Sequence, residues 1–326
     1  MFHVFSLAKA LINIHLLKKR TPLFLSWNIT FRCNLRCQYC AACDAPPEEL
    51  TTEEIKAGLD ALWKLGTRWI TFGGGEPLIR QDIGEIVQYA RSRGFQCYLS
   101  TNGSLLKSKL ESIKPGVQHI NLSLDGSETV HDQVRGKGSY AKAIEALELC
   151  KSSGTSVSLQ CVLNRYNLDD FHKAVETAQH YKVPIMFQPA TKWLSTSLES
   201  NPIAPDTAPY REAIQKIIAL KQRGAPIRNS YTGLKHLAHW PDPQPIFCAA
   251  GKSMAILEAD GSMLACHQCQ VKDFLHGTAA SGTWPEKFKN MPLPKHCAQC
   301  WCAPVVELCL FFSLKPEAML NALRYR

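Results

Sequence analysis

Short apolar runs alternate with amphipathic stretches between Pro22 and about Arg223. Strands are predicted at Leu23–Thr30, Trp69–Phe72, Gln96–Ser100, His119–Leu124, Val157–Leu163 and Pro184–Gln188. Helices are predicted at Thr52–Leu65, Asp82–Arg93, Ser104–Ile113, Tyr140–Ser152, Leu168–Tyr181 and Asp206–Gln222. Six strand–helix pairs predict a parallel sheet with right-handed crossovers. Because a full barrel needs two more units, the pattern predicts an α/β fold, a partial (β/α)6 TIM-like barrel with its chemistry at the carboxyl ends of the strands.

The first 20 residues show helical periodicity, with apolar positions on one side and Ser6, Lys9 and Asn13 on the other. The apolar positions are Val4, Leu7, Ala8, Leu11, Ile12 and Ile14. The basic residues follow this stretch instead of preceding it, so the pattern does not indicate a secretion signal. The helix either packs against the barrel or docks on a membrane surface or a partner.

The last third of the chain changes character after the proline-rich segment 241–245. A β-hairpin is predicted from Met254–Leu257 and Met263–Ala265, joined by a turn at Ala259–Ser262. We expect an N-terminal helix at residues 1–21, a core at 22–240, and a small cysteine-rich β-hairpin/α domain with a tail at 241–326. The apolar run Leu308–Leu314 is too short to span a bilayer.

Composition adds one unusual feature, which is 14 cysteines in 326 residues, seven of them at or after Cys248. Without a secretion signal, this number favours metal or redox chemistry in a reducing, cytoplasmic compartment over disulfides. The net charge of +9 would suit an anionic membrane surface or an acidic substrate. The chain has no aromatic–basic RNA-binding signature and no Lys/Arg block, so nucleic acid is disfavoured.

Cys33, Cys37 and Cys40 are separated by three and by two intervening residues. Three thiolates at this spacing can each bind one iron of a [4Fe-4S] cube and leave the fourth iron open. Buried core thiols or a zinc site are the alternatives, but zinc patterns need four ligands. Cys43 could compete for the fourth iron and is treated as a bystander.

This spacing resembles the signature of the radical S-adenosylmethionine (SAM) enzymes. The resemblance implies that SAM chelates the open iron through its amino and carboxylate groups. An electron from the cluster then splits SAM into methionine and a 5′-deoxyadenosyl radical. Tyr39 matches the aromatic position that the family places beside the adenine.

The glycine-rich turn after the second predicted strand, Gly73-Gly74-Gly75-Glu76-Pro77, resembles the family's GGEP motif. By this resemblance Gly74, Gly75 and Glu76 bind the SAM ammonium. Polar residues also end the third and fourth strands, where they suit a ribose or a carboxylate. These residues are Thr101, Asn102 and Ser123.

The stretch Asn121–Gly136 resembles peptide-modifying and sulfatase-maturing radical SAM enzymes, which implies that Ser123 and Arg135 contact SAM. Asn102-Gly103 and Asp125-Gly126 are also good turn sequences, so turn-only roles stay open. Neither Asp125 nor His131 can be singled out as a general base.

The C-terminal cysteines resemble the auxiliary-cluster domains called SPASM or twitch. Cys248, Cys266, Cys297 and Cys300 form the ligand set that we expect for one auxiliary [4Fe-4S] cluster. The later spacings depart from the full pattern, so exchanges with Cys269, Cys302 or Cys309, a second cluster, and a zinc ribbon stay open.

The combined resemblance, from roughly Leu23 to Cys300, predicts a radical SAM oxidoreductase whose deoxyadenosyl radical takes a hydrogen atom from a substrate. The expected substrate is a peptide, such as a ribosomal peptide precursor, or a small metabolite. The expected electron donor is a protein such as flavodoxin or ferredoxin. The alternatives are an enzyme that acts on a membrane lipid, peripherally bound to the membrane, and a non-catalytic Fe–S binding or sensor protein.

Overall fold

The computed structural model describes residues 2–40, 48–194, 199–267, 282–294 and 300–324. In this part of the chain, eight strands form one sheet in the order β6-β5-β4-β3-β2-β1-β7-β8. Strands β1 to β6 are parallel, and their bounds are Phe24–Thr30, Trp69–Gly74, Gln96–Thr101, His119–Ser123, Val157–Leu163 and Ile185–Pro189. The predicted strands are confirmed to within two residues at each end, and so is the α/β partial-barrel class.

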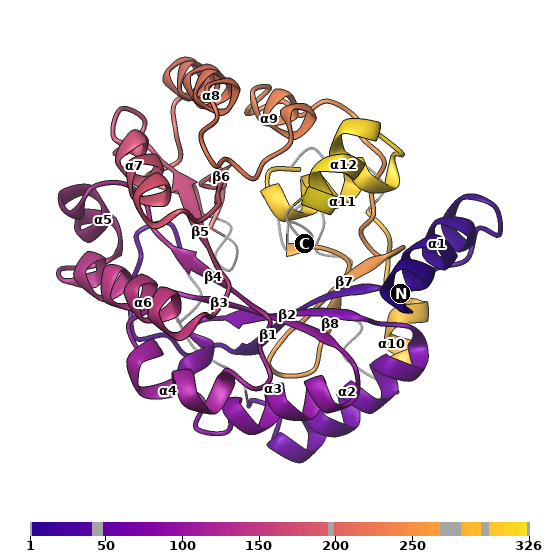
Figure 1. Ribbon diagram of the computed structural model, residues 1–326. Coiled ribbons are helices and arrows are strands. Elements are labelled where there is room, and N and C mark those ends of the chain that lie inside the picture. The colour runs from indigo at the N-terminus through magenta and orange to yellow at the C-terminus, as the bar shows by residue number, and fades with distance from the viewer. Residues whose placement is uncertain (1, 41–47, 195–198, 268–281, 295–299, 325–326) are drawn as a thin grey trace.

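Helices of the barrel connect these strands and cover their outer side (Figure 1). The six predicted helices are observed as α2 (Thr52–Leu65), α3 (Ile83–Ser92), α4 (Leu106–Ile113), α6 (Ser139–Ser153), α7 (Phe171–Tyr181) and α8 (Thr207–Gln222). A 3-10 turn, η1, spans Pro77–Ile79. The sequence does not predict α5 (Glu128–Arg135), because this eight-residue helix is mostly polar and Val130 and Val134 are its only apolar residues.

The two faces of the sheet differ in chemistry. Trp27 points outward, because an added Cβ on Gly58 of α2 would lie 3.1 Å from its ring. Its neighbours Ser26 and Asn28 therefore point to the concave side, and both are half-buried. The same alternation continues along β3 and β4, so the concave side of the barrel is polar and accessible while the outer side is fully buried.

The C-terminal third completes the architecture. The predicted hairpin is confirmed as β7 (Met254–Leu257) and β8 (Met263–Leu264), which are antiparallel. Strand β7 also pairs in parallel with β1, so the hairpin extends the barrel sheet. Helices α9, α11 and α12 lie across the gap between β6 and β7 in Figure 1. Their bounds, with α10, are Tyr231–Leu237 (α9), Trp284–Asn290 (α10), Ala303–Phe312 (α11) and Pro316–Arg324 (α12).

The N-terminal segment forms the predicted helix, α1 (Phe2–His15). Its buried face is Leu7, Ala10 and Ile14, which is narrower than predicted, because Ala8 and Ile12 are exposed. Among the described residues, the helices are all too short or too polar to cross a membrane. The apolar run 308–314 mostly lies within α11, which packs into the core.

Candidate active site

The segment Cys33–Cys40 follows β1 at the carboxyl end of the sheet, and both of its ends are fixed to the barrel. Near its start, Asn34 donates a hydrogen bond to Ser104 Oγ (2.7 Å) and accepts one from Asn102 Nδ2 (3.1 Å). Near its end, the backbone N–H of Gln38 donates to the carbonyl of Val134 in α5 (3.0 Å). The cysteine segment is therefore placed over the ends of β3 and β4 by backbone and amide contacts.

The three thiols of this segment lie close enough to influence one another. Cys33 and Cys37 are half-buried, and Cys40 is exposed. Burial raises the pKa of the Cys37 thiol to about 11, and the nearby Arg135 guanidinium acts in the opposite direction. Three cysteines in one segment beside a buried cation are a donor set that suits an iron–sulfur cluster, because cluster ligation requires thiolates.

The turn after β2 packs tightly against the residues that precede Cys33. The N–H groups of Gly75 and Glu76 donate to the carbonyls of Thr30 (2.9 Å) and Arg32 (2.8 Å). A side chain on Gly75 would collide with the Arg32 carbonyl, and Gly74 has a φ of 113°. By contrast, the nearest atom to an added Cβ on Gly73 is Ser100 Cβ at 3.8 Å, so Gly73 leaves space on the concave side.

Glu76 is completely buried and ties the turn to the end of β3. Its carboxylate accepts hydrogen bonds from Thr101 Oγ1 (2.8 Å), from the N–H of Asn102 (2.8 Å) and from the N–H of Leu78 (3.1 Å). Burial raises its pKa to about 7, although these three donors favour the charged form. The backbone at Gly74 is exposed, whereas the Glu76 carboxylate is buried.

Asp125 joins four segments of the site. Its Oδ2 pairs with Arg135 Nε (2.6 Å) and accepts from the Tyr39 hydroxyl (3.1 Å), while Oδ1 accepts from the Val162 N–H (2.8 Å). Arg135 also lies over the Tyr39 ring, with its guanidinium carbon 5.4 Å from the ring centroid. Burial opposes the charge of Arg135, but Asp125, Tyr39 and Cys37 together outweigh it, so the pKa of Arg135 lies well above its usual value. Because the pair uses Nε, a carboxylate ligand would bind Arg135 through its terminal nitrogens.

The two residues that sequence reasoning left open as general bases both have structural roles. His131 is buried, and its Nδ1 accepts from the Asp125 N–H (3.1 Å). Burial lowers the pKa of His131 to about 4, so the ring is neutral near pH 7. Asp125 and His131 therefore both hold the loop after β4 in place.

The concave side below the site is lined by polar side chains. Ser123 ends β4, is half-exposed, and lies opposite Gln160 of β5 in the sheet register. The side-chain oxygen of Gln160 is buried and has no hydrogen-bond partner among the described residues. A buried acceptor without a donor is costly, so this oxygen marks a place where a ligand or water donates.

The C-terminal cysteines that the structure describes are Cys248, Cys266, Cys300, Cys302 and Cys309. The thiol of Cys309, in α11, lies within hydrogen-bonding reach of both Cys248 and Cys300, and it accepts from the Ala249 N–H (3.3 Å). Cys266 is buried just after β8. Sequence reasoning placed Cys309 only among the possible exchanges, because no spacing rule connects it to the others. Cys43, Cys269 and Cys297 lie outside the described residues.

In the described ranges, no three His, Cys, Asp or Glu side chains are already arranged to hold a metal ion. This holds for both cysteine groups.

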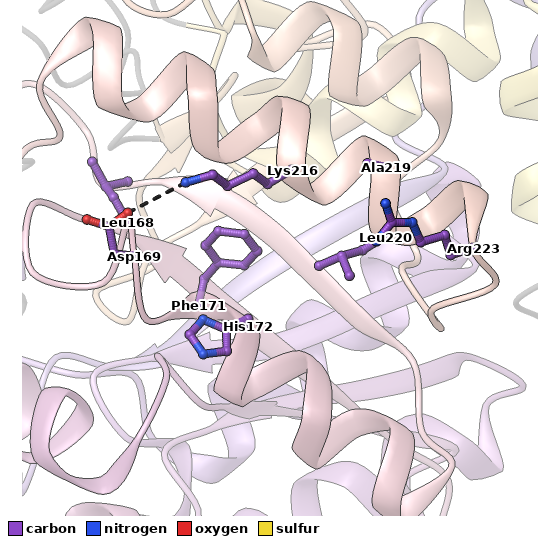
Figure 2. A pocket seen from close by; sticks show the side chains of 8 residues that line it. All are labelled: Leu168, Asp169, Phe171, His172, Lys216, Ala219, Leu220 and Arg223. Carbon is purple, nitrogen blue, oxygen red and sulfur yellow. Dashed lines mark ion pairs between the residues drawn. The ribbon is translucent and has the colours of Figure 1, made fainter.

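Figure 2 shows a separate pocket of about 350 Å³ on the outer side of the barrel, between α7 and α8. Lys216 crosses it to pair with Asp169 (3.7 Å). The pocket includes none of the predicted site residues and lies outside the strand mouths, so it has no part in the candidate site.

Comparison with known proteins finds relatives of both the partial barrel and the part of the chain that carries the cysteine segment. Residues 27–178 match the model of the Radical SAM superfamily. This match covers just under half of the chain and includes the three-cysteine segment, the glycine-rich turn and the Asp125–Arg135 pair.

Two curated relatives match different extents of the chain. Fe-coproporphyrin III synthase of Methanosarcina barkeri is 37% identical over 175 residues, which are 51% of this chain and 43% of the relative. Mycofactocin maturase MftC of Mycolicibacterium smegmatis is 26% identical over 299 residues, which are 86% of this chain and 74% of the relative. The chain thus spans less than half the length of the first relative and about three quarters of the second.

Solved structures share the fold at low sequence identity. Streptococcus suis SuiB bound to S-adenosylmethionine has a TM-score of 0.64 at 17% identity, covering 80% of this chain and 63% of SuiB. Native anSMEcpe with bound AdoMet has a TM-score of 0.62 at 16% identity, covering 92% of this chain and all of anSMEcpe. The likeness extends into the cysteine-rich C-terminal third, because both alignments cover far more than residues 27–178.

Proposed function

We propose that this protein binds a [4Fe-4S] cluster through Cys33, Cys37 and Cys40, binds SAM beside it, and uses the reductive cleavage of SAM to take a hydrogen atom from a substrate. The observation that carries the proposal is the docking of this three-cysteine segment over the buried Asp125–Arg135 pair. When bound, the cluster supplies the electron that splits SAM into methionine and a 5′-deoxyadenosyl radical. A reduced flavodoxin or ferredoxin supplies that electron in turn.

The surrounding residues have two kinds of role in this proposal. Tyr39 packs beside the adenine, Arg135 binds the SAM carboxylate through its terminal nitrogens, and the Gly74–Gly75 backbone faces the ammonium. Ser123 lines the cavity. Glu76, Thr101 and Asn102 have the second role, which is to hold the glycine-rich turn and the cysteine segment in place.

We further propose that the region after residue 241 holds one auxiliary [4Fe-4S] cluster. The contacts of Cys309 with Cys248 and Cys300 support these three residues as ligands. The fourth ligand is Cys266 or Cys297. This proposal divides the chain into a helix at 1–21, a core at 22–240 and an auxiliary-cluster region at 241–326. The β7–β8 hairpin of the last region continues the sheet of the core.

A peptide is the substrate that the comparisons favour. The match to Mycofactocin maturase MftC covers most of the chain, whereas the match to Fe-coproporphyrin III synthase covers about half. SuiB was solved with precursor peptide SuiA, and anSMEcpe with the Cp18Cys peptide. The polar concave side, with the unpartnered Gln160 oxygen, suits a substrate rich in amide groups.

The test is anaerobic reconstitution with iron and sulfide, followed by dithionite and SAM, with 5′-deoxyadenosine measured by mass spectrometry. We expect Cys37→Ala to lower its formation by at least ~1,000-fold, because three thiolates are needed to hold the cluster. The matched control is Cys150→Ala, which removes a buried thiol of α6 and should retain activity. If the parent holds its full iron and still forms no product with SAM and candidate peptides, the non-catalytic alternative replaces the proposal.

A further inference from the structure

The large apolar side chains that the described part of the chain exposes are not evenly spread. Eight such residues are exposed, and six of them lie on or just after α1 and α11–α12: Phe5, Ile12, Leu16, Leu17, Leu314 and Leu320. Isolated exposed hydrophobic residues are ordinary, but a concentration on neighbouring elements marks an interaction surface. Figure 1 shows α1, α11 and α12 on the same side of the molecule.

Helix α1 is apolar on two opposite faces. Leu7, Ala10 and Ile14 are buried against the core. At about 100° per residue, Phe5, Ile12 and Leu16 project from the opposite side of the helix. These three are 68%, 49% and 74% exposed, so the outer face of the helix is an unpaired apolar stripe. Packing against the barrel explains the inner face only.

The end of α1 is fixed beside the end of α11. His15 hydrogen-bonds through Nε2 to the carbonyl of Phe312 (2.8 Å), and its ring lies 5.5 Å from that of Phe247. Leu16 and Leu314 are each within two residues of this contact. The stripe on α1 and Leu314 therefore belong to one surface, which we call the α1–α11 surface.

Basic residues border the α1–α11 surface. Lys9, Lys18, Lys19 and Lys315 are all exposed. The first acidic residue of the chain is Asp44, so the N-terminal segment carries no negative side chain to oppose them. An apolar stripe with a lysine border complements an anionic lipid surface, where lysines meet head groups and apolar side chains enter the interface. Two copies of this chain would instead bring two basic borders together.

We propose that the α1–α11 surface docks this protein on an anionic lipid bilayer, with α1 lying in the plane of the interface. This inference is independent of the proposed SAM chemistry. It needs no membrane-spanning segment, because docking uses only side chains that already face outward.

The experiment is vesicle flotation of the full chain with reconstituted clusters. We expect the protein to float with vesicles of equal parts phosphatidylcholine and phosphatidylglycerol, and not with phosphatidylcholine alone. Phe5→Ser/Ile12→Ser/Leu16→Ser should lower the bound fraction by at least ~10-fold, because the insertion of apolar side chains is lost. Lys18→Glu/Lys19→Glu should lower it by a similar ~10-fold on anionic vesicles, and high salt should mimic this variant.

Tyr166→Ser/Leu293→Ser is the matched control, since it removes two exposed apolar residues that lie outside α1, α11 and α12, and it should float like the parent. None of the replaced side chains belongs to the buried core, so all variants should keep the iron content of the parent. Failure of the parent to float with anionic vesicles overturns the proposal, and so does undiminished flotation of the triple variant. A parent dimer that the triple variant converts to a monomer by light scattering would assign the surface to a second copy instead.

Discussion

The two cysteine groups of this protein are assembled in different ways. Cys33, Cys37 and Cys40 lie in one eight-residue segment, fixed over the strand ends by Asn102 and α5. Cys248, Cys300 and Cys309 come from separate segments and meet only because α11 packs near the chain that leads into β7. A sequence motif therefore identifies the first group directly, whereas tertiary packing decides which thiols belong to the second.

The largest expected difference between the two cysteine groups is that one cluster can be lost without the other. We expect Cys309→Ser to remove about four iron atoms per reconstituted chain and to leave the SAM-binding cluster in place. Iron analysis and the yield of 5′-deoxyadenosine without substrate would measure the two separately. Cys97→Ser, at a buried thiol of β3, is the control and should lose no iron. Full iron in Cys309→Ser would exclude Cys309 as a ligand.

The next effect concerns the buried ion pair under the first group. Asp125→Ala leaves the Arg135 charge buried without its partner, which costs about 3–5 kcal/mol of unfolding free energy. Asp60→Ala breaks an exposed pair with Arg93 (2.8 Å) and should cost less than about 1 kcal/mol. Urea unfolding of both variants measures the difference. Equal losses would contradict the central role of Asp125.

The features that the sequence predicts are local ones, as in the first cysteine group. Strand and helix positions were predictable because the outer faces of β1 to β6 are continuously apolar and the turns carry Gly and Pro. The strand-end motifs were also placed together correctly, since parallel strands bring their carboxyl ends to one edge.

Two features were not accessible from the sequence. The pairing of β7 with β1 joins residues more than two hundred positions apart, and only the folded chain shows it. The burial of Glu76 and Asp125 was equally hidden, because a motif names a carboxylate without showing how many donors surround it. The sequence therefore predicts where the candidate site lies, but not which of its residues are buried and which are exposed.

A third effect compares two buried carboxylates, one in each region. The raised pKa of Glu76, about 7, means that its contribution to stability is complete below pH 4.5 and is lost as the pH rises through 7. Relative to Glu76→Gln, the parent should lose about 3 kcal/mol of unfolding free energy across this range.

Glu307 is the counterpart of Glu76 in the C-terminal third, where it accepts from the Ser230 N–H (2.8 Å) at the start of α9. Burial raises the pKa of Glu307 to about 7 as well. Glu307→Gln should therefore change the pH dependence of stability in the same direction and leave SAM cleavage intact. Only Glu76→Gln should also lower 5′-deoxyadenosine formation, because Glu76 holds the turn beside the first cysteine group. If both variants cleave SAM like the parent, Glu76 has no positioning role.

The smallest effects separate two glycines of the same turn. Gly75→Ala should cost about 1–3 kcal/mol and loosen the cysteine segment, because its methyl group would meet the Arg32 carbonyl. Gly73→Ala has room for a methyl group 3.8 Å from Ser100 Cβ, so unfolding free energy should change by less than about 1 kcal/mol. If SAM packs against the backbone at Gly73, Gly73→Ala will raise the KM for SAM and leave kcat little changed. The added methyl group would then occupy space that SAM needs. An unchanged KM would show that SAM does not use the free space at Gly73.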